Sequence, residues 1–73
     1  MPIPPMKSVY SSCISYIGYD EEEGAFYVRW YRTGKLSKYS GVDRITAQQI
    51  LEAPSVGESV TSVLKQGYDH EYV

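Results

Sequence analysis

Apolar and polar positions alternate along residues 24–34, and this alternation predicts a β-strand with two unlike sides. One side is strongly apolar, whereas the other combines aromatic and basic residues. The apolar side comprises Phe26, Val28 and Trp30, and the opposite side comprises Tyr27, Arg29 and Tyr31. Because a large apolar side must be buried, we expect this segment to form the centre of the core. Its aromatic and basic side is the first candidate for a binding surface.

Two further strands are predicted, one on each side of this segment in the sequence. The first spans residues 13–19, and an exposed acidic turn over residues 20–24 connects it to the central strand. The second spans residues 36–40 and follows a tight turn. Neither side of this last segment is uniformly apolar, so its pattern leaves the register of the strand open.

Two short helices are predicted after the strands. Asp43 is a favourable N-cap for the first helix, over residues 44–53. Ser55 and Glu58 match the capping box of the second helix, over residues 56–66. Each helix has an apolar stripe to bury, formed by Ala47, Ile50 and Leu51 in the first and by Val60, Val63 and Leu64 in the second. The predicted fold class is therefore α+β, a three-stranded antiparallel sheet followed by two short helices packed on one sheet face.

The chain divides into a flexible proline-rich arm over residues 1–7 and a single domain over residues 8–73. A chain of 73 residues is too short for two domains that each bury a core. Proline favours an extended arm over a helix. Ile3 and Met6 are apolar residues on this arm, so they are candidates for contact with a partner; the alternative is a frayed terminus.

Composition and charge both favour a binding protein. Tyr occurs eight times, and this residue suits half-buried positions and interfaces because its ring packs while its hydroxyl forms hydrogen bonds. The net charge is −2, but residues 26–44 carry five basic residues against one acidic residue. The total charge argues against a general polyanion binder, whereas the local basic segment leaves a specific acidic partner open.

Few residues are available for catalysis or for metal binding. Catalysis needs a nucleophile, a base and an orienting group held together, and the chain has one cysteine, Cys13, and one histidine, His70, far apart in the sequence. We therefore expect no enzyme activity, no metal site and no cofactor. A single cysteine forms no internal disulfide, which is typical of a reduced cytoplasmic setting. No run of residues is apolar enough for a membrane span, and we expect a monomer without a membrane partner.

The candidate binding surface extends from the central strand into the hairpin that follows it. It consists of Tyr27, Arg29, Tyr31, Arg32, Lys35, Lys38 and Tyr39. These residue types dominate the hot spots of protein interfaces. Aromatic rings on a sheet with nearby cations also bind single-stranded RNA. A solvated sheet face, on which tyrosine and arginine merely stack on one another, accounts for the same pattern, so three interpretations remain open.

Several short motifs occur in a fixed order along almost the whole chain. They are Val9-x-Ser11-Ser12, Ile14-x-x-Ile17-Gly18-Tyr19-Asp20, Phe26-x-Val28-x-Trp30, Gly34, Tyr39-x-Gly41-Val42, Leu51-x-Ala53-x-Ser55-x-Gly57, Tyr68 and Tyr72-Val73. In this order and spacing they resemble the KTSC domain, a short module at the C-terminus of some bacterial lysyl-tRNA synthetases and in free-standing bacterial and phage proteins. The synthetase attachment implies an RNA-binding (tRNA-type) accessory module.

The chain departs from the KTSC pattern at two positions. The family's central Tyr-x-Tyr falls on Ser37-Lys38-Tyr39, so the first aromatic residue is absent. Asp43 stands where a proline usually follows the Gly-Val step.

Among free-standing members, the length, the acidic character and the start Met-Pro-Ile-Pro-Pro resemble a phage-type transcription regulator, as found in a Xanthomonas phage. This resemblance implies a protein of the host cytoplasm that binds core subunits of bacterial RNA polymerase. It would inhibit transcription initiation by weakening σ-factor retention, without catalysis.

Overall fold

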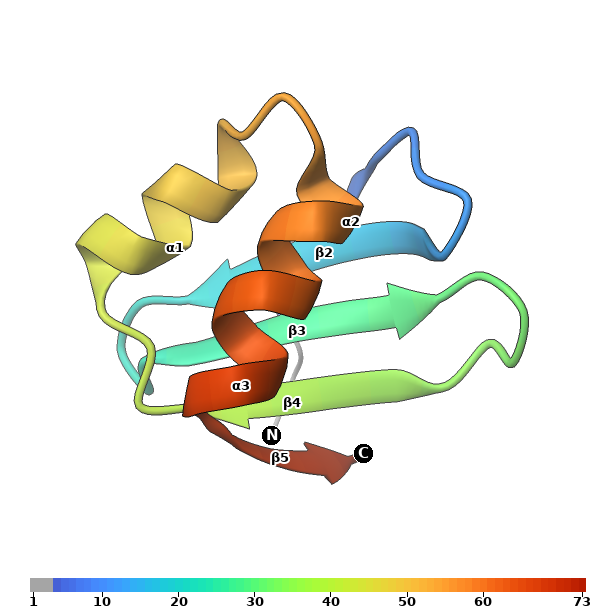
Figure 1. The fold of residues 1–73 in the computed structure, drawn as a ribbon. Coiled ribbons are helices and arrows are strands. Elements are labelled where there is room, and N and C mark those ends of the chain that lie inside the picture. The colour runs from blue at the N-terminus through green and yellow to red at the C-terminus, as the bar shows by residue number, and fades with distance from the viewer. Residues whose placement is uncertain (1–3) are drawn as a thin grey trace.

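An antiparallel sheet with helices on one side makes up the fold of residues 4–73, the part of the chain that the computed structural model describes (Figure 1). The five strands of this sheet lie in the order of the sequence, and each is antiparallel to the next. They are β1 (Lys7–Ser8), β2 (Ile14–Asp20), β3 (Ala25–Trp30), β4 (Leu36–Ser40) and β5 (Asp69–Tyr72). The α+β class is confirmed.

The prediction of a three-stranded sheet is wrong, because β1 and β5 add one strand at each edge. Lys7 pairs with Ile17 in β2, and Asp69 pairs with Ser40 in β4. Every residue of β1 and of β5 is exposed. Neither strand therefore has the apolar alternation that identifies the three inner strands in the sequence. Residues 69–72 of the C-terminal tail are therefore part of the sheet.

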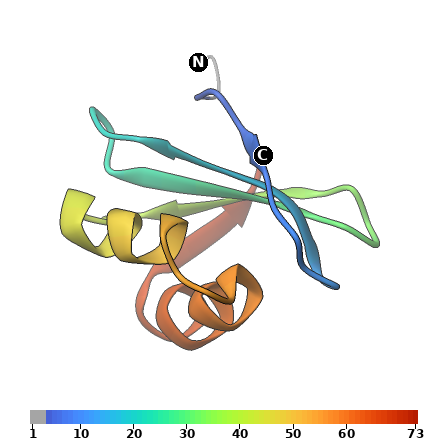
Figure 2. The same ribbon diagram turned by 90° about the horizontal axis from the view of Figure 1, so that it is seen from above.

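The helices lie on one side of the sheet, and the residues that lead into β1 lie on the other side (Figure 2). α1 (Arg44–Leu51) begins after Asp43, whose Oδ1 accepts a hydrogen bond of 2.7 Å from the Thr46 backbone N–H. The second helix is continuous through α2 (Val56–Ser59), the π-helical segment η1 (Val60–Leu64) and α3 (Lys65–Gly67). The Ser55 side chain forms no capping hydrogen bond. Within residues 4–73, no helix has the length and apolar character to cross a membrane.

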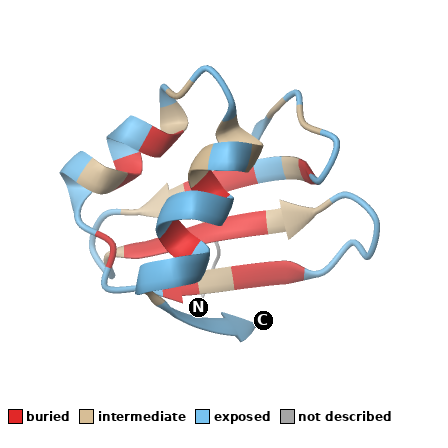
Figure 3. Ribbon diagram, in the orientation of Figure 1, coloured by how far each residue is buried: buried red, intermediate tan, exposed pale blue. Residues whose placement is uncertain are grey.

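The main core lies between the sheet and the helices (Figure 3). Its buried residues are Ile14, Ile17, Phe26, Val28, Tyr39, Val42, Ala47, Ile50, Val60 and Leu64. The apolar side of the central strand thus meets the stripes of both helices, as predicted. Val63 is an exception, since 38% of it is exposed. It lies in η1, where the wider turn of a π-helix changes the spacing of the buried positions.

The register of β3 and β4 decides which side of the sheet each residue of β4 faces. Phe26 pairs with Tyr39, and Val28 pairs with Ser37. Because paired residues share a face, Tyr39 and Ser37 lie on the side that the helices cover. Lys38 pairs with Tyr27 on the opposite side, which we call the outer face.

Candidate functional site

The outer face of the sheet, which carries much of the predicted binding surface, is partly covered by the N-terminal arm. Met6 packs against a second buried cluster, formed by Ala25, Tyr27 and Leu36. Only 4% of Tyr27 is exposed. Gly18 in β2 permits this close approach, because a Cβ at its position would lie 2.6 Å from the Met6 Sδ and 2.9 Å from a carbonyl oxygen of the arm. This part of the outer face is therefore a small second core.

The basic residues of the outer face are engaged with other groups of the protein. The Lys38 Nζ lies 3.3 Å from the Glu23 Oε2, and the hydrogen bond to this carboxylate raises the pKa of Lys38. The Arg29 Nη1 donates a hydrogen bond of 2.7 Å to the Gly34 carbonyl oxygen. Each side chain thus ties its strand to a neighbouring turn.

Tyr39 does not join Tyr27 on one surface. It lies on the helix-covered side, only 2% of it is exposed, and burial raises the pKa of its hydroxyl. Ile3 lies outside the described residues. The sheet therefore separates the two tyrosines that were predicted to act together.

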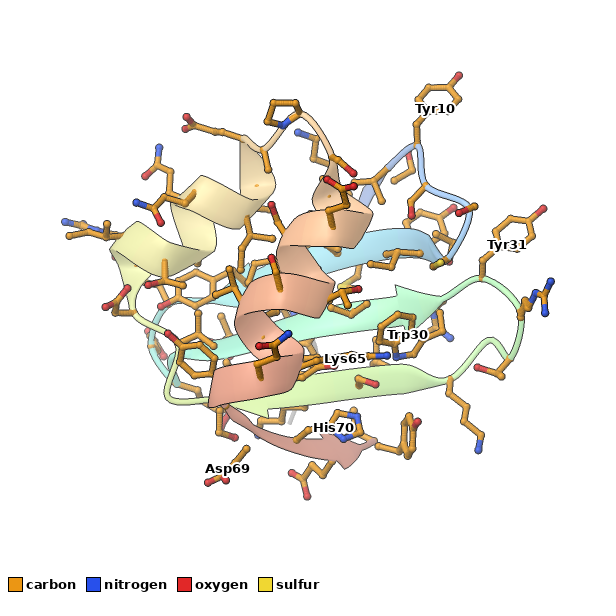
Figure 4. The ribbon with its side chains drawn as sticks, in the orientation of Figure 1. Tyr10, Trp30, Tyr31, Lys65, Asp69 and His70 are labelled. Carbon is orange, nitrogen blue, oxygen red and sulfur yellow. The ribbon has the colours of Figure 1, made fainter. Side chains whose placement is uncertain are left out.

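Three of the predicted residues, Tyr31, Arg32 and Lys35, remain exposed in the turn between β3 and β4. Tyr31 is 68% exposed. Tyr10 is fully exposed in the connection between β1 and β2, and it projects from the same end of the sheet as Tyr31 (Figure 4). The Tyr31 backbone N–H donates to the Cys13 carbonyl oxygen over 2.8 Å, which holds these two segments together. We call Tyr10, Tyr31, Arg32 and Lys35 the loop end.

A pocket of about 600 Å³ opens beside the loop end, between the sheet and the second helix. Its volume lies within the range of small-molecule sites in proteins. The pocket is lined by residues of β3, β4, β5, α3 and the two connections, among them Trp30, Arg32, Tyr39, Lys65, His70 and Tyr72. Trp30, Lys65 and His70 lie around this region in Figure 4.

The buried Ser37 hydroxyl contacts two rings of the pocket, the indole of Trp30 and the imidazole of His70. Ser37 is completely buried, and its Oγ accepts a hydrogen bond of 2.6 Å from the Trp30 Nε1–H. The same Oγ lies 2.9 Å from the His70 Nε2. Because the hydroxyl is buried and shared in this way, the Ser37–His70 pair presents no nucleophile to a substrate. The Ser37 hydroxyl instead orients the indole of Trp30 and the imidazole of His70.

Two lysines lie over aromatic rings of the same region. The Lys65 Nζ lies 4.7 Å from the centre of the Trp30 ring, and the Lys35 Nζ lies 4.9 Å from the centre of the Tyr72 ring. Such cation–π contacts are favourable, and both lysines are exposed. The His70 ring meets Tyr72 edge-on, with 4.8 Å between ring centres. The pocket thus combines aromatic walls with a cationic rim.

The comparison with protein families decides where the chain belongs. The family model of the KTSC domain matches residues 10–69, which is most of the chain. The chain belongs to the KTSC domain family. A search of curated proteins found no match.

The fold of this KTSC domain is also similar to that of a solved relative, the crystal structure of a KTSC domain protein from Yersinia pestis. The two chains are 26% identical, and the alignment has a TM-score of 0.87. It covers 94% of this chain and 96% of the relative.

The pocket of this KTSC domain contains residues that the sequence did not single out. Trp30 was assigned only to the core, His70 was considered only for catalysis, and Tyr72 was named only as a position of the family motifs. Lys65 was assigned no role. Their sequence positions are far apart, and only β5, which has no apolar pattern, brings His70 and Tyr72 beside β4. The one available signal was the combination of a single Trp with an excess of Tyr. Within residues 4–73, no group of three or more potential metal ligands is assembled.

Proposed function

We propose that this KTSC protein is a phage-type transcription regulator that binds the core of bacterial RNA polymerase. Binding inhibits transcription initiation by weakening σ-factor retention, and no catalysis is involved. The choice of polymerase rests on the resemblance of the chain to phage-type regulators, and the choice of a protein partner rests on the loop end.

The loop end is the observation that carries the proposal. Its exposed residues are two tyrosines, an arginine and a lysine, and Tyr and Arg are the residues most enriched in interface hot spots. Tyr31 is held by a turn that begins at the end of a buried strand, so its backbone is ordered before binding. A preorganised aromatic side chain loses little conformational entropy when it enters a partner's pocket.

The distribution of charge supports contact with more than one surface. The acidic turn between β2 and β3 lies at one end of the sheet, and the basic turn between β3 and β4 lies at the other end (Figure 1). At the acidic end, Glu21 faces Arg44 over 3.4 Å, a weak and exposed ion pair. Oppositely charged ends allow the two ends of a small protein to be steered to different sites on a large partner.

The inhibition follows from a difference in affinity. A ligand that binds core polymerase more tightly than the σ-bound enzyme shifts the equilibrium away from σ binding by that difference. A ratio of about one hundred corresponds to roughly 2.8 kcal/mol, within reach of one or two hot-spot residues.

RNA binding through the sheet, the alternative function, has less support from the geometry. It requires Tyr27, Tyr31 and Tyr39 to present their rings together as a stacking platform. Tyr27 and Tyr39 are buried on opposite sides of the sheet, which leaves Tyr31 as the accessible ring of the three.

Binding to purified core polymerase tests the proposal directly. Tyr31→Ala should weaken retention about tenfold, because truncation of an aromatic hot spot typically costs more than 1 kcal/mol. Tyr16→Ala is the matched control, since Tyr16 is also an exposed tyrosine, at 43%, but lies within β2 and in neither of the two charged turns. Equal retention of both variants, or no retention of the parent at low salt, would refute the proposal.

A further inference from the structure

The pocket beside the loop end has a charge that differs from that of the whole protein. The chain has a net charge of −2, yet among the described residues that line the pocket none is acidic, and the cations Arg32 and Lys65 are present. A concave site that concentrates cations in an acidic protein attracts an anion. Arg and Lys, assisted by hydroxyl groups such as those of Ser12 and Thr33 in the lining, are the residues that bind phosphate.

The walls of the pocket select a flat aromatic group in addition to an anion. Trp30 and Tyr72 supply exposed ring surface, and Tyr39 forms part of the lining. The hydrogen bond from the Trp30 Nε1–H to the buried Ser37 holds the indole in one orientation. Nucleobases stack favourably on aromatic side chains. A ring that is already held in one orientation loses less conformational entropy when a base stacks on it.

We propose that this pocket binds a nucleotide, with the base on Trp30 or Tyr72 and the phosphate between Arg32 and Lys65. Lys65 is exposed, and its ammonium now lies over the Trp30 ring. A base that stacks on the indole takes the place of this ammonium, which then turns to the phosphate. Ligand binding thus exchanges one cation–π contact for a stacking contact and a charge-assisted hydrogen bond.

The pocket shares Arg32 with the loop end but not the tyrosine on which the proposed polymerase contact depends. Tyr31 is not among the lining residues, and its ring projects away from the molecule (Figure 4). Nucleotide binding can therefore be tested in the absence of polymerase, and its result does not depend on whether the protein binds polymerase.

Titration of the full chain with adenosine monophosphate tests the proposal. Trp30 is the single Trp, so its indole N–H gives one resonance and its fluorescence reports this pocket alone. We expect saturable shifts of the indole resonance and of the amides of Thr33, Lys65 and His70. Adenosine and inorganic phosphate, each tested alone, should bind at least about tenfold more weakly, because each lacks one half of the recognition. Equal binding of phosphate alone, or no shift with any of the three, would overturn the proposal.

Charge variants separate a specific site from general attraction. Arg32→Gln and Lys65→Gln should each weaken binding of adenosine monophosphate roughly tenfold, as expected for the loss of a charge-assisted hydrogen bond. Arg44→Gln removes the same charge at the other end of the molecule and should change the affinity less than about twofold. All three residues are exposed, so the variants keep the fold. An equal loss in all three variants would show nonspecific attraction and refute the site.

The ligand of the pocket is either a free nucleotide or the phosphorylated terminal nucleotide of an RNA. A short RNA with a 5′-phosphate, and the same RNA without it, distinguish them. Tighter binding of the phosphorylated RNA than of adenosine monophosphate assigns the pocket to an RNA end. Equal or weaker binding assigns it to the free nucleotide.

Discussion

At the scale of single residues, Ser37 has the most consequence for the candidate site. It occupies the position where the KTSC pattern has an aromatic residue, and its side chain points into the helix-covered side of the sheet. There its hydroxyl meets both the Trp30 indole and the His70 imidazole. A small hydrogen-bonding group thus stands at this position, and two rings are arranged around it.

Removal of this hydroxyl should destabilise the fold. Ser37→Ala leaves the Trp30 Nε1–H without its partner in a partly buried site, and an unsatisfied group of this kind costs about 1–3 kcal/mol. Chemical denaturation measures the loss, and the indole resonance of Trp30 should shift at the same time. Ser40→Ala, an exposed position in the same strand, is the control and should be nearly neutral. Equal stabilities of the two variants would contradict the role of Ser37.

At the scale of elements, α1 shows how one side chain sets a helix boundary. The Asp43 carboxylate accepts the backbone N–H of Thr46, and this hydrogen bond lowers the pKa of Asp43 below its ordinary value of 3.8. Since the folded pKa is lowered, the stabilisation is fully present above the ordinary pKa. It is lost as the pH falls through the folded pKa.

Substitution of Asp43 should therefore affect stability in a pH-dependent way. Asp43→Ala should lower the Tm by several degrees at neutral pH, because alanine cannot cap. The gap to the parent should narrow as the pH falls through the folded pKa of Asp43, which lies below 3.8, because the protonated carboxyl loses its charge although it keeps a capping oxygen. Asp43→Asn keeps a capping oxygen without the charge, so its Tm should stay close to that of the parent at neutral pH. Thermal unfolding followed by circular dichroism between pH 2 and 7 tests this expectation; a gap that is constant with pH would contradict it.

Elements with a strong local signal could be predicted from the sequence, and those without one could not. α1 has a cap and an apolar stripe, and β3 has strict alternation, so both lie where the pattern placed them. The burial of Val63 was predicted from regular helical spacing, which the π-helical segment interrupts. β5 reads Asp-His-Glu-Tyr, and its place in the sheet is set by pairing with β4 rather than by any pattern of its own.

At the scale of the whole molecule, the sheet is covered on both sides, by the helices on one side and by the arm on the other. This arrangement explains why Tyr27 and Tyr39 of the predicted surface are buried. The sequence showed correctly that Tyr27 faces away from Phe26, but it contained no sign that residues 4–6 would cover it. The pocket could not be predicted from the sequence either, because its lining comes from segments that meet only in the complete fold.

A side chain at Gly18 should lift the arm from the sheet. Gly18→Ala brings a Cβ within 2.6 Å of the Met6 Sδ, so the arm has to move and the cluster around Tyr27 opens. We expect faster hydrogen exchange at the amides of β1 and a loss of about 1–3 kcal/mol in unfolding free energy. Gly67→Ala is the control, since nothing lies within 4 Å of a Cβ there. Unchanged exchange in β1 of the Gly18 variant would contradict the proposed packing of the arm.

The exposed edge strand β5 has a consequence for the behaviour of the protein at high concentration. An unpaired strand edge is a template for pairing with a second copy, which is the first step of aggregation. Asp69 and Glu71 lie on this edge, two residues apart and on the same side of the strand. Antiparallel pairing of two β5 edges would bring these carboxylates of one copy against those of the other. Mutual repulsion therefore protects the edge, and the acidity of the last strand acts as a safeguard of solubility.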